Sequence, residues 1–436
     1  MISIEVKQRI RHMNPWLEQP QRAEEYIGRF LPSPYVPRKV DMPSIVTNRA
    51  FLVVGPRQAG KSTFVWNTLK PLAPHILFLN MEDPLLRVGC ASAVEFTAHI
   101  RETYPFIKAV FIDEVQHMAE AGLFVKGLVD ARLDMSLWIT GSSSFHLRSK
   151  TRESLAGRAT RRKLLPFSMG ELLSYRQPAS DISRRYESEQ ILNHQLIYGS
   201  YPAVYLIQEP GEKINLLNDL VESLILRDAS DLFRIKRIDA FRRLLTLLAG
   251  QIGQIVNLSE LAAICGVDVG SIGNYIEIME ESHIIKVLSP FAGGRRREIT
   301  RAPKVFFIDN GIRNQLLNLF SPASPMRADR GALFENWAFT EISKAVPITA
   351  DIKFWRSKGG AEIDFVIENA GKIVAVEVKS TALRHPKLGR SARSFIDAYR
   401  PERFALLNLT LDEEMDIEGC RVNFLTPCHF IQWLTG

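Results

Sequence analysis

The residues with the most recognisable chemistry lie between Gly55 and Ser62, where two glycines, a lysine and a serine follow the spacing G-x-x-x-x-G-K-S. Backbone N–H groups of such a loop can surround a phosphate, and the helix that follows turns its positive dipole end toward it. Lys61 would reach the outer phosphates, and the Ser62 hydroxyl would bind Mg²⁺. An ordinary strand–turn–helix with a chance lysine is the alternative, but the complete spacing behind an apolar strand favours a nucleotide-binding loop. The residues expected to contact ATP are Gly55, Pro56, Arg57, Gln58, Ala59, Gly60, Lys61, Ser62 and Thr63.

A second pair of candidate residues, Asp113 and Glu114, follows the apolar run Ala109–Ile112. Asp113 would hold Mg²⁺ through water, and Glu114 would polarise the water that attacks the outer phosphate. A strand that ends in two acids is common by itself, but its place behind a complete phosphate loop favours the catalytic interpretation. We therefore predict that Lys61, Asp113 and Glu114 are catalytic, and that Ser62 and Asp113 are metal ligands.

Two further candidates follow the third apolar run, Leu137–Thr140. The Ser142 hydroxyl could contact the γ-phosphate of a bound nucleotide or the attacking water, although Gly-Ser runs are also ordinary turns. Arg158 is a candidate arginine finger, which acts on a neighbouring subunit and contributes about 10³–10⁵-fold in rate where it operates. A surface arginine is an equally good interpretation of Arg158.

A separate set of charged residues lies in the last quarter of the chain. Glu377 and Lys379 are two positions apart on an expected strand and so share a face. Asp364 is on the expected partner strand of a hairpin, where cross-strand neighbours are close enough to share a cation. Glu335 is near the start of an expected helix.

These four residues have the types that metal-dependent phosphodiester chemistry needs. Asp364 and Glu377 would hold Mg²⁺ or Mn²⁺, and Glu335 would add a ligand. Lys379 would orient or deprotonate water and offset charge on the scissile phosphate. A solvated ion-pair face is the alternative, because it is the usual role of E-x-K on a strand. We predict a phosphodiesterase-type site, active or degenerate, with catalytic residues Glu335, Asp364, Glu377 and Lys379.

The elements that must position the first set of residues can be predicted from apolar runs. Two lead-in helices are followed by a proline-rich connector to which we assign no chemistry of its own. Short strands then end in polar residues, as expected at the ligand-binding edge of an open parallel sheet. The predicted helices are Ser3–His12 and Arg22–Phe30, and the strands begin at Phe51, His75, Ala109 and Leu137.

The middle of the chain is predicted to be helical from about 180 to 248 and then to form a helix–turn–helix, Leu258–Cys265 and Val269–Ser282, with Ser259 as the first helix cap. Two extended runs with an arginine-rich loop between them, Gly293–Arg301, would complete a winged helix whose basic wing lies against phosphates. The second helix is acidic, which argues against deep insertion into a major groove. DNA binding and a structural or dimerising role both remain open.

The last segment is predicted as a helix, three strands, a second helix and a fourth strand. A turn at Asn369–Gly371 joins the second and third of the three consecutive strands. The predicted ranges are 331–346, 351–357, 361–368, 372–380, 385–399 and 403–409.

Composition limits the class of protein. The chain has 436 residues, 46% hydrophobic and 24% charged, as in ordinary soluble globular proteins. Its net charge of +7 makes a polyanionic partner plausible, and basic residues gather in two stretches, Arg148–Lys163 and Gly293–Arg301. The sequence has no long apolar run and no apolar segment typical of a secretory signal. Four widely spaced cysteines fit a reducing environment, so we expect a cytoplasmic location without a membrane partner.

Several motifs in order resemble a known family. FLVVGPRQAGKST, AVFIDEVQ, ITGSSS and LAGR…LLPFSMGEL resemble the AAA-type ATPases of bacteria and archaea that carry a C-terminal domain of unknown function, as do LIYGSYPAVYL and VESLILRDASDLFRI. The resemblance extends from about Val36 to Asn408. It implies a P-loop domain with a three-layer α/β fold, and assembly into oligomers. The order of elements in the last segment resembles that of the PD-(D/E)XK nucleases, in which many domains bind without cutting.

Together these observations predict a multidomain α/β protein. The expected segments are a lead-in and linker (1–50), a P-loop ATPase domain (51–178), a helical lid (179–249), a winged helix (250–310) and a PD-(D/E)XK nuclease-like domain (325–436). The favoured function is an ATPase that acts on DNA, such as branched or damaged DNA. Metal-dependent cleavage of that DNA is left open. The alternatives are a regulatory ATPase with non-cutting interaction domains, and a motor that remodels branched DNA without cleavage.

Overall fold

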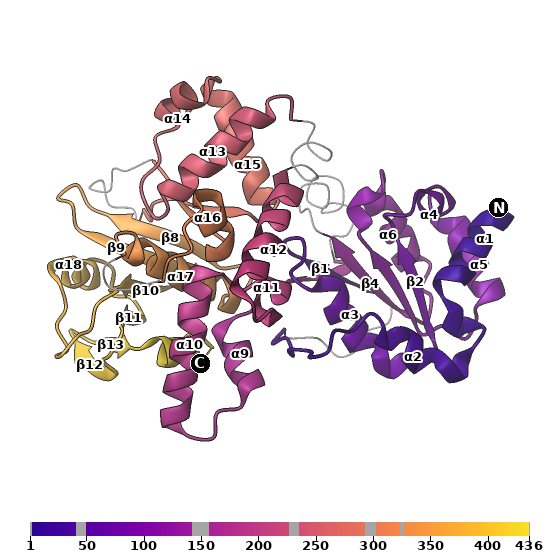
Figure 1. Ribbon diagram of the computed structural model, residues 1–436, viewed down its shortest axis with the longest axis horizontal. Coiled ribbons are helices and arrows are strands. Elements are labelled where there is room, and N and C mark those ends of the chain that lie inside the picture. Colours follow the sequence, from indigo (N-terminus) through magenta and orange to yellow (C-terminus); the bar gives the residue numbers. More distant parts are fainter. Residues whose placement is uncertain are drawn as a thin grey trace. The chain divides into compact units, whose positions relative to one another are not determined.

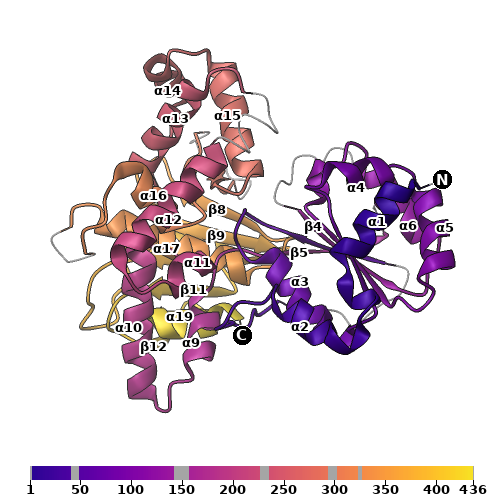
Figure 2. The same ribbon diagram turned by 45° about the vertical axis from the view of Figure 1, so that its right-hand side comes forward.

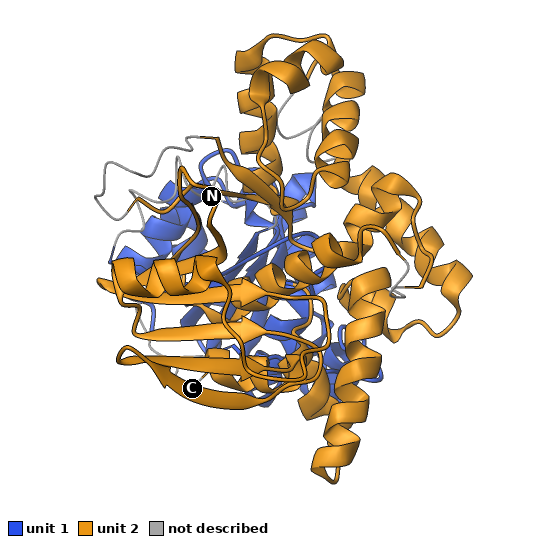
Figure 3. Ribbon diagram, turned by 90° about the vertical axis from the view of Figure 1, so that its left-hand side faces the viewer, with its two compact units in different colours: residues 1–165 blue, residues 166–436 orange. Residues whose placement is uncertain are grey.

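The computed structural model describes residues 2–40, 49–141, 157–225, 235–292, 302–322 and 327–435. The chain divides into two compact units, residues 1–165 and 166–436 (Figure 3). Ser142, the part of the first basic stretch before Gly157, and the arginine-rich segment Gly293–Arg301 lie outside the described residues. The finer domain boundaries expected within the two units stay predictions.

The first unit is built on a five-stranded parallel sheet in the order β2-β3-β4-β1-β5. Four strands follow the predicted apolar runs. The sequence does not predict β5, because its residues are mostly polar and only half-buried, and its strand character depends on pairing with β1. The strands are β1 Ala50–Val54, β2 Ile76–Asn80, β3 Ala109–Asp113, β4 Ser136–Gly141 and β5 Ala159–Lys163.

Helices cover both faces of this sheet. Alternate residues of a strand point to opposite faces: Leu52 and Val54 belong to one apolar cluster, Phe51 and Val53 to another. The first cluster includes residues of α1, α4, α5 and α6, and the second includes residues of α2 and α3. The unit therefore has the expected three layers (Figure 1). The helices are α1 Ile4–Met13, α2 Ala23–Gly28, α3 Lys61–Leu69, α4 Pro84–Gly89, α5 Ala93–Thr103 and α6 Ala121–Asp130.

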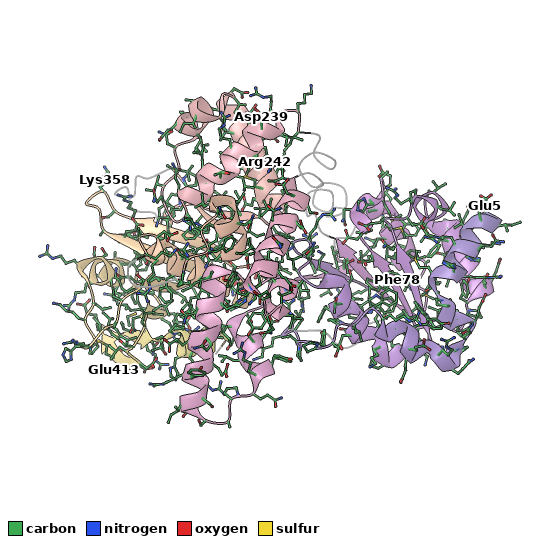
Figure 4. The ribbon with its side chains drawn as sticks, viewed as in Figure 1. Glu5, Phe78, Asp239, Arg242, Lys358 and Glu413 are labelled. Atoms are coloured by element: carbon green, nitrogen blue, oxygen red, sulfur yellow. The ribbon has the colours of Figure 1, made fainter. Side chains whose placement is uncertain are left out.

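The N-terminal segment protects an edge of the sheet. The Asn14 side chain accepts a hydrogen bond from the N–H of Phe78 (2.6 Å) and donates one to its carbonyl oxygen (2.9 Å). The indole N–H of Trp16 donates to the carbonyl oxygen of Ile76 at 2.8 Å. Both acceptor residues are on the edge strand β2, and Phe78 is labelled in Figure 4. These side chains satisfy backbone groups that an edge strand would otherwise expose.

The second unit contains a six-stranded mixed sheet in the order β12-β13-β11-β10-β9-β8. β8, β9 and β10 are antiparallel, and β10, β11 and β13 are parallel to one another. The helix α17 precedes the sheet in the chain, and α18 packs on it with Ala392, Phe395 and Ile396. The elements are α17 Arg330–Ala345, β8 Asp351–Arg356, β9 Glu362–Asn369, β10 Lys372–Val378, α18 Arg390–Tyr399, β11 Arg403–Leu407, β12 Glu413–Ile417, β13 Cys420–Leu425 and α19 Pro427–Thr435.

Two features of this sheet differ from the prediction. The helix expected from His385 begins only at Arg390, because Pro386 restricts the residue before it to extended backbone and Gly389 is the N-cap. The strands β12 and β13 and the helix α19 are not predicted by the sequence analysis. β12 is mostly exposed and acidic, so it shows no apolar pattern.

A helix–turn–helix and a β-hairpin also belong to the second unit (Figure 2). The predicted bounds of α14 are confirmed, but its N-cap is Asn257 and not Ser259. The Asn257 side chain accepts hydrogen bonds from the N–H groups of Ser259 and Glu260, so Ser259 is already inside the helix. The elements are α13 Ile238–Gly250, α14 Leu258–Cys265, α15 Val269–Glu281, β6 Ile285–Leu288 and β7 Lys304–Phe307. Their order is the predicted one, and the winged-helix assignment stays a prediction.

The remaining helices of this unit fall mainly in the region predicted to be helical. They are α9 Met169–Arg176, α10 Asp181–Ile197, α11 Pro202–Leu206, α12 Pro210–Ser223 and α16 Asn310–Leu317. Within the described part of the chain, no single helix has the length and apolar character to cross a membrane, although α14 and α15 together, bent by 100°, would meet those two criteria.

Candidate functional site

The phosphate loop lies between the end of β1 and the start of α3. A Cβ atom added at Gly55 would lie 2.0 Å from the carbonyl oxygen of Leu164, so only glycine fits there. Gly60 has a φ of 87° and is the N-cap of α3, a conformation that favours glycine. The two glycines of the motif are therefore required by close approach and by backbone conformation. The helix α3 begins at Lys61, so its N-terminal N–H groups face the loop.

The ammonium of Lys61 lies inside this loop. The side chain is buried, and Nζ donates hydrogen bonds to the carbonyl oxygens of Gly55 at 3.1 Å and Pro56 at 2.7 Å. The Lys61 ammonium therefore lies inside the loop, at the position where this motif binds phosphate. Exchange of these backbone contacts for contacts with phosphate oxygens would place the ammonium on a bound nucleotide.

Ser62 and Asp113 are brought together from two elements. Ser62 Oγ donates a hydrogen bond to Asp113 Oδ1 at 2.9 Å. Thr140, which the sequence analysis does not single out, donates to the same oxygen from β4 and accepts from the N–H of Glu114 at 3.2 Å. Burial raises the pKa of Asp113 above its usual range, and the hydrogen bonds from Thr140 and Ser62 oppose that rise. A hydroxyl and a carboxylate side by side suit Mg²⁺.

Glu114 stands next to Asp113 in a left-handed backbone conformation, with a φ of 55°. Gln116 donates a side-chain hydrogen bond to Glu114 Oε2. Glu114 also lies near Glu82 and His117. One possible metal-ligand atom from each of the three residues lies within 4.8 Å of the other two. The carboxylate is therefore oriented by its neighbours at the same sheet edge as the phosphate loop.

Arg158 lies at the other end of the sheet. Its carbonyl oxygen accepts from the N–H of Ala50 at 2.9 Å, at the start of β1, whereas the phosphate loop follows the end of that strand. Five strand residues separate the two by about 15 Å. Arg158 Nε donates to Asp130 Oδ1 at 2.7 Å. Arg158 is thus not brought to the nucleotide site of its own chain, and a role in a neighbouring subunit stays a prediction.

The proline-rich connector, to which the sequence analysis assigns no chemistry, contributes Arg38 to the loop. Its guanidinium donates to the carbonyl oxygens of Ala59 (2.8 Å) and Leu165, the last residue of the first unit. Arg38 thereby fixes the backbone of the phosphate loop against the chain that follows β5. No local sequence signal indicates this, because the three residues are far apart in the chain.

In the second unit, the predicted charged residues also come together. Val376 lies opposite Phe365 in the antiparallel register of β9 and β10, which places Asp364 beside Glu377. Asp364 Oδ2 accepts from the N–H of Val378 at 2.7 Å, and Lys379 Nζ lies 2.7 Å from Glu377 Oε1. The Lys379 side chain is 48% exposed and that of Glu377 only 6%.

Glu335 reaches the same cluster from α17 and brings two residues that the sequence analysis misses. Lys304 on β7 has its Nζ 3.5 Å from Glu335 Oε1 and 2.5 Å from Glu362 Oε1. Burial raises the pKa of Glu335 to about 8, and the charge of Asp364 adds to the rise. Burial likewise raises the pKa of Asp364 to about 6. We call Glu335, Glu362, Asp364 and Glu377 the carboxylate cluster.

Two buried oxygens of the carboxylate cluster are incompletely satisfied. Glu335 Oε1 has Lys304 Nζ at the long ion-pair distance of 3.5 Å, and no described residue donates a hydrogen bond to Glu377 Oε2. Buried polar atoms without a partner are unusual and costly. Carboxylate oxygens are the ligands that Mg²⁺ and Mn²⁺ prefer, so the residues present fit a divalent cation.

Comparison with protein families identifies three segments of the chain. Residues 47–173 match the family described as AAA domain. The matched range includes the phosphate loop, Asp113 and Glu114. The chain contains an AAA-type P-loop ATPase domain. Residues 189–323 and 330–430 match two families described as domains of unknown function, DUF8612 and DUF4143.

Similar proteins that match most of the chain occur in several organisms. An uncharacterized protein of Methanocaldococcus jannaschii is 24% identical over 340 residues, 75% of this chain and 74% of that protein. An uncharacterized protein of Mycobacterium tuberculosis is 24% identical over 366 residues, 82% of this chain and 75% of that protein. One of Haemophilus influenzae is 23% identical over 397 residues, 88% of this chain and 93% of that protein.

Two solved structures of replication proteins show a weaker likeness. The Orc1 protein of Aeropyrum pernix in complex with DNA is 12% identical, with 70% of this chain and 92% of that chain covered and a TM-score of 0.30. The replication initiator DnaA bound to AMPPCP and single-stranded DNA is 11% identical, with 58% and 92% covered and a TM-score of 0.28.

Proposed function

We propose that the ATPase domain hydrolyses ATP with Mg²⁺ at the carboxyl edge of its parallel sheet, through Lys61, Ser62, Asp113 and Glu114. The observation that carries the proposal is the 2.9 Å hydrogen bond between Ser62 Oγ and Asp113 Oδ1. It brings a hydroxyl from the helix after the phosphate loop to a carboxylate at the end of β3. Such a pair binds Mg²⁺ in P-loop enzymes, where phosphoryl transfer depends on positioning and charge stabilisation.

Each residue has a separate task in this proposal. Lys61 exchanges its bonds to Gly55 and Pro56 for bonds to the outer phosphates of ATP. Ser62 and Asp113 hold Mg²⁺, which offsets the charge that develops on the phosphate oxygens. Glu114 polarises the attacking water and accepts its proton, while the hydrogen bond from Gln116 keeps the carboxylate oriented.

Replacement of Glu114 tests this division of tasks. We expect Glu114→Gln to bind ATP as the wild type does but to hydrolyse it about 10²–10⁴-fold more slowly, because the amide cannot accept the proton. Phosphate release and the binding of a fluorescent ATP analogue measure the two steps. Glu102→Gln, which removes an exposed carboxylate of α5, should change neither. Unchanged hydrolysis in Glu114→Gln would remove Glu114 from the mechanism.

We further propose that the protein binds DNA. The support is the net charge of +7 together with the arginine-rich segment Gly293–Arg301, which connects the two strands of the β6–β7 hairpin. Phosphate contacts from such residues release counterions and make affinity fall with salt. A structural or dimerising role of this region is the rival hypothesis.

Salt dependence of DNA binding distinguishes the two roles. We expect replacement of Arg295, Arg296 and Arg297 by glutamine to weaken binding and to reduce the slope of log affinity against log salt by up to about 0.9 for each lost contact. Fluorescence anisotropy between low and moderate salt measures the slope. A triple variant at Arg22, Arg29 and Arg101, which are exposed in the first unit, should change the slope less. Equal slopes in all three proteins would exclude the wing as the DNA contact.

A second candidate activity is metal-dependent cleavage of phosphodiester bonds by the second unit. It is favoured by the buried Glu377 Oε2, to which no described residue donates a hydrogen bond, and by Glu335 Oε1, which has Lys304 Nζ only at 3.5 Å. Asp364 and Glu377 would hold a divalent cation with help from Glu335, and the bound cation would activate water and offset charge on the phosphate. Lys379, which is half-exposed beside Glu377, would contact the scissile phosphate. The PD-(D/E)XK-like assignment of this unit belongs to the same proposal.

A further inference from the structure

Lys304 lies among the acidic residues of the carboxylate cluster, although it belongs to no motif in the sequence. Its Nζ lies 2.5 Å from Glu362 Oε1 and 3.5 Å from Glu335 Oε1, and its side chain is 5% exposed. We propose that Lys304 is an internal counter-ion that positions Glu335 and Glu362 and limits the affinity of the cluster for a divalent cation. The inference rests on the metal-dependent site proposed for the second unit.

Lys304 cannot easily turn away from the cluster. Its ammonium lies over the ring of Phe354, 5.4 Å from the ring centroid. Its strand β7 is paired with β6 on one side and makes a bridge to Ile255 on the other. On the Ile255 side, the N–H of Gly253 donates to the carbonyl oxygen of Val305 at 3.0 Å. The lysine is therefore held by backbone pairing, a ring and two carboxylates.

Glu335 is enclosed from the same side. A Cβ atom added at Gly253 would lie 3.2 Å from Glu335 Oε2, so the backbone of that loop closely approaches the carboxylate. Gly253 has a φ of 72°, in the region that favours glycine. The strand β7 and the Gly253 loop thus fix Glu335 from the side of the helix–turn–helix. Lys304 is the cation that contacts its carboxylate, at 3.5 Å.

The two lysines beside the cluster differ in their freedom to move. Lys379 is half-exposed, so its ammonium can leave Glu377 when another cation arrives. Lys304 is buried and has no such route. A divalent cation held by Asp364 and Glu377 with help from Glu335 would therefore bind near a fixed positive charge, and that charge opposes its binding.

The size of the repulsion between Lys304 and a bound divalent cation follows from Coulomb's law. A unit positive charge about 5 Å from a divalent cation, at an effective dielectric constant of about 20, would weaken binding by about 10⁴–10⁵-fold before screening. Water in the partly open site and salt reduce the effect. We therefore expect removal of the Lys304 charge to strengthen cation binding by about tenfold or more.

Titration of the nucleotide-free full chain with Mn²⁺ tests the inference, by calorimetry or by the electron paramagnetic resonance of free Mn²⁺. We expect Lys304→Met to bind Mn²⁺ about tenfold more tightly than the wild type, and Lys304→Arg, which keeps the charge, to bind as the wild type does. Lys304→Gln serves the same purpose if the methionine variant fails to fold, which circular dichroism would reveal. Lys372→Met is the matched control, because Lys372 begins β10, far from Glu377, and pairs with Glu402 at the surface.

Each outcome of the titration distinguishes this inference from the proposed metal site. The site requires Asp364→Asn to abolish Mn²⁺ binding in the wild-type or the Lys304→Met background. If Asp364-dependent binding is present but equal or weaker in Lys304→Met, the inference is overturned and the site stands. If Lys372→Met or Lys304→Arg strengthened Mn²⁺ binding as much as Lys304→Met does, the inference would be overturned as well. Absence of Asp364-dependent binding in every variant would overturn both the inference and the site.

Discussion

Lys61→Ala is expected to abolish ATP turnover, with a loss of at least about 10²–10³-fold, while the protein stays folded. The lysine is a charged side chain that the phosphate loop encloses, and its ammonium donates hydrogen bonds to the carbonyl oxygens of Gly55 and Pro56. Removal of one preorganised donor from a site of developing charge costs about that much in rate. Alanine is the best helix former, so α3 should still begin at this position.

The control for this experiment lies at the other end of the same helix. Lys70 is exposed and follows the last turn of α3, so Lys70→Ala should leave turnover unchanged. Phosphate release at saturating ATP measures turnover, and thermal unfolding followed by circular dichroism measures the fold. Normal turnover by a folded Lys61→Ala variant would show that the phosphate loop is not the site of hydrolysis.

Asp364→Ala is expected to abolish the DNA cleavage proposed for the second unit, with a loss of about 10³-fold or more. Asp364 is a predicted metal ligand, and loss of the bound cation would remove several kcal/mol of stabilisation from the transition state. Incubation of linear, supercoiled and branched DNA with Mg²⁺ or Mn²⁺, with and without ATP, measures cleavage. A difference between the lanes with and without ATP would show whether nucleotide controls cutting.

Glu368→Ala is the matched control for the cleavage experiment. Glu368 is on the same strand β9 but pairs with Lys353, away from the cluster, so its removal should not affect cleavage. Cleavage that persists in Asp364→Ala would remove this residue from the site. Shifted DNA bands without cleavage in the wild type would instead favour a binding or remodelling protein. Neither binding nor cleavage would favour the regulatory ATPase with a protein partner.

The residues proposed for the nucleotide site have local signals in the sequence. The spacing from Gly55 to Ser62 and the acids after Ile112 each lie within one strand–loop segment, and the structure brings Ser62 and Asp113 together. Thr140 donates to the same Asp113 oxygen as Ser62 because β4 lies next to β3. This strand order cannot be read from any single stretch of the sequence. Arg38 is a similar case, since only the fold carries the connector to the loop.

The second unit shows the same limit more clearly. Glu377 and Lys379 are recognisable because alternate residues of an expected strand share a face, and the hairpin register places Asp364 beside Glu377. The strand β10 ends at Val378, one residue earlier than Lys379, but the Lys379 ammonium still reaches Glu377. Lys304 and Glu362 have no such signal. Lys304 reaches the cluster from a strand that also pairs in the helix–turn–helix part of the chain, so its role depends on packing between distant segments. The strand β5 is not predicted for a related reason. Its residues are mostly polar and show no strand pattern, and its extended conformation depends on pairing with β1.

Phosphate release from ATP by the purified full chain tests the central claim most directly, with the wild type beside Lys61→Ala and Glu114→Gln in Mg²⁺. We predict steady release by the wild type, almost none by either variant, and ATP binding retained in Glu114→Gln. Equal release by all three folded proteins would contradict the claim that ATP is hydrolysed at the carboxyl edge of the parallel sheet.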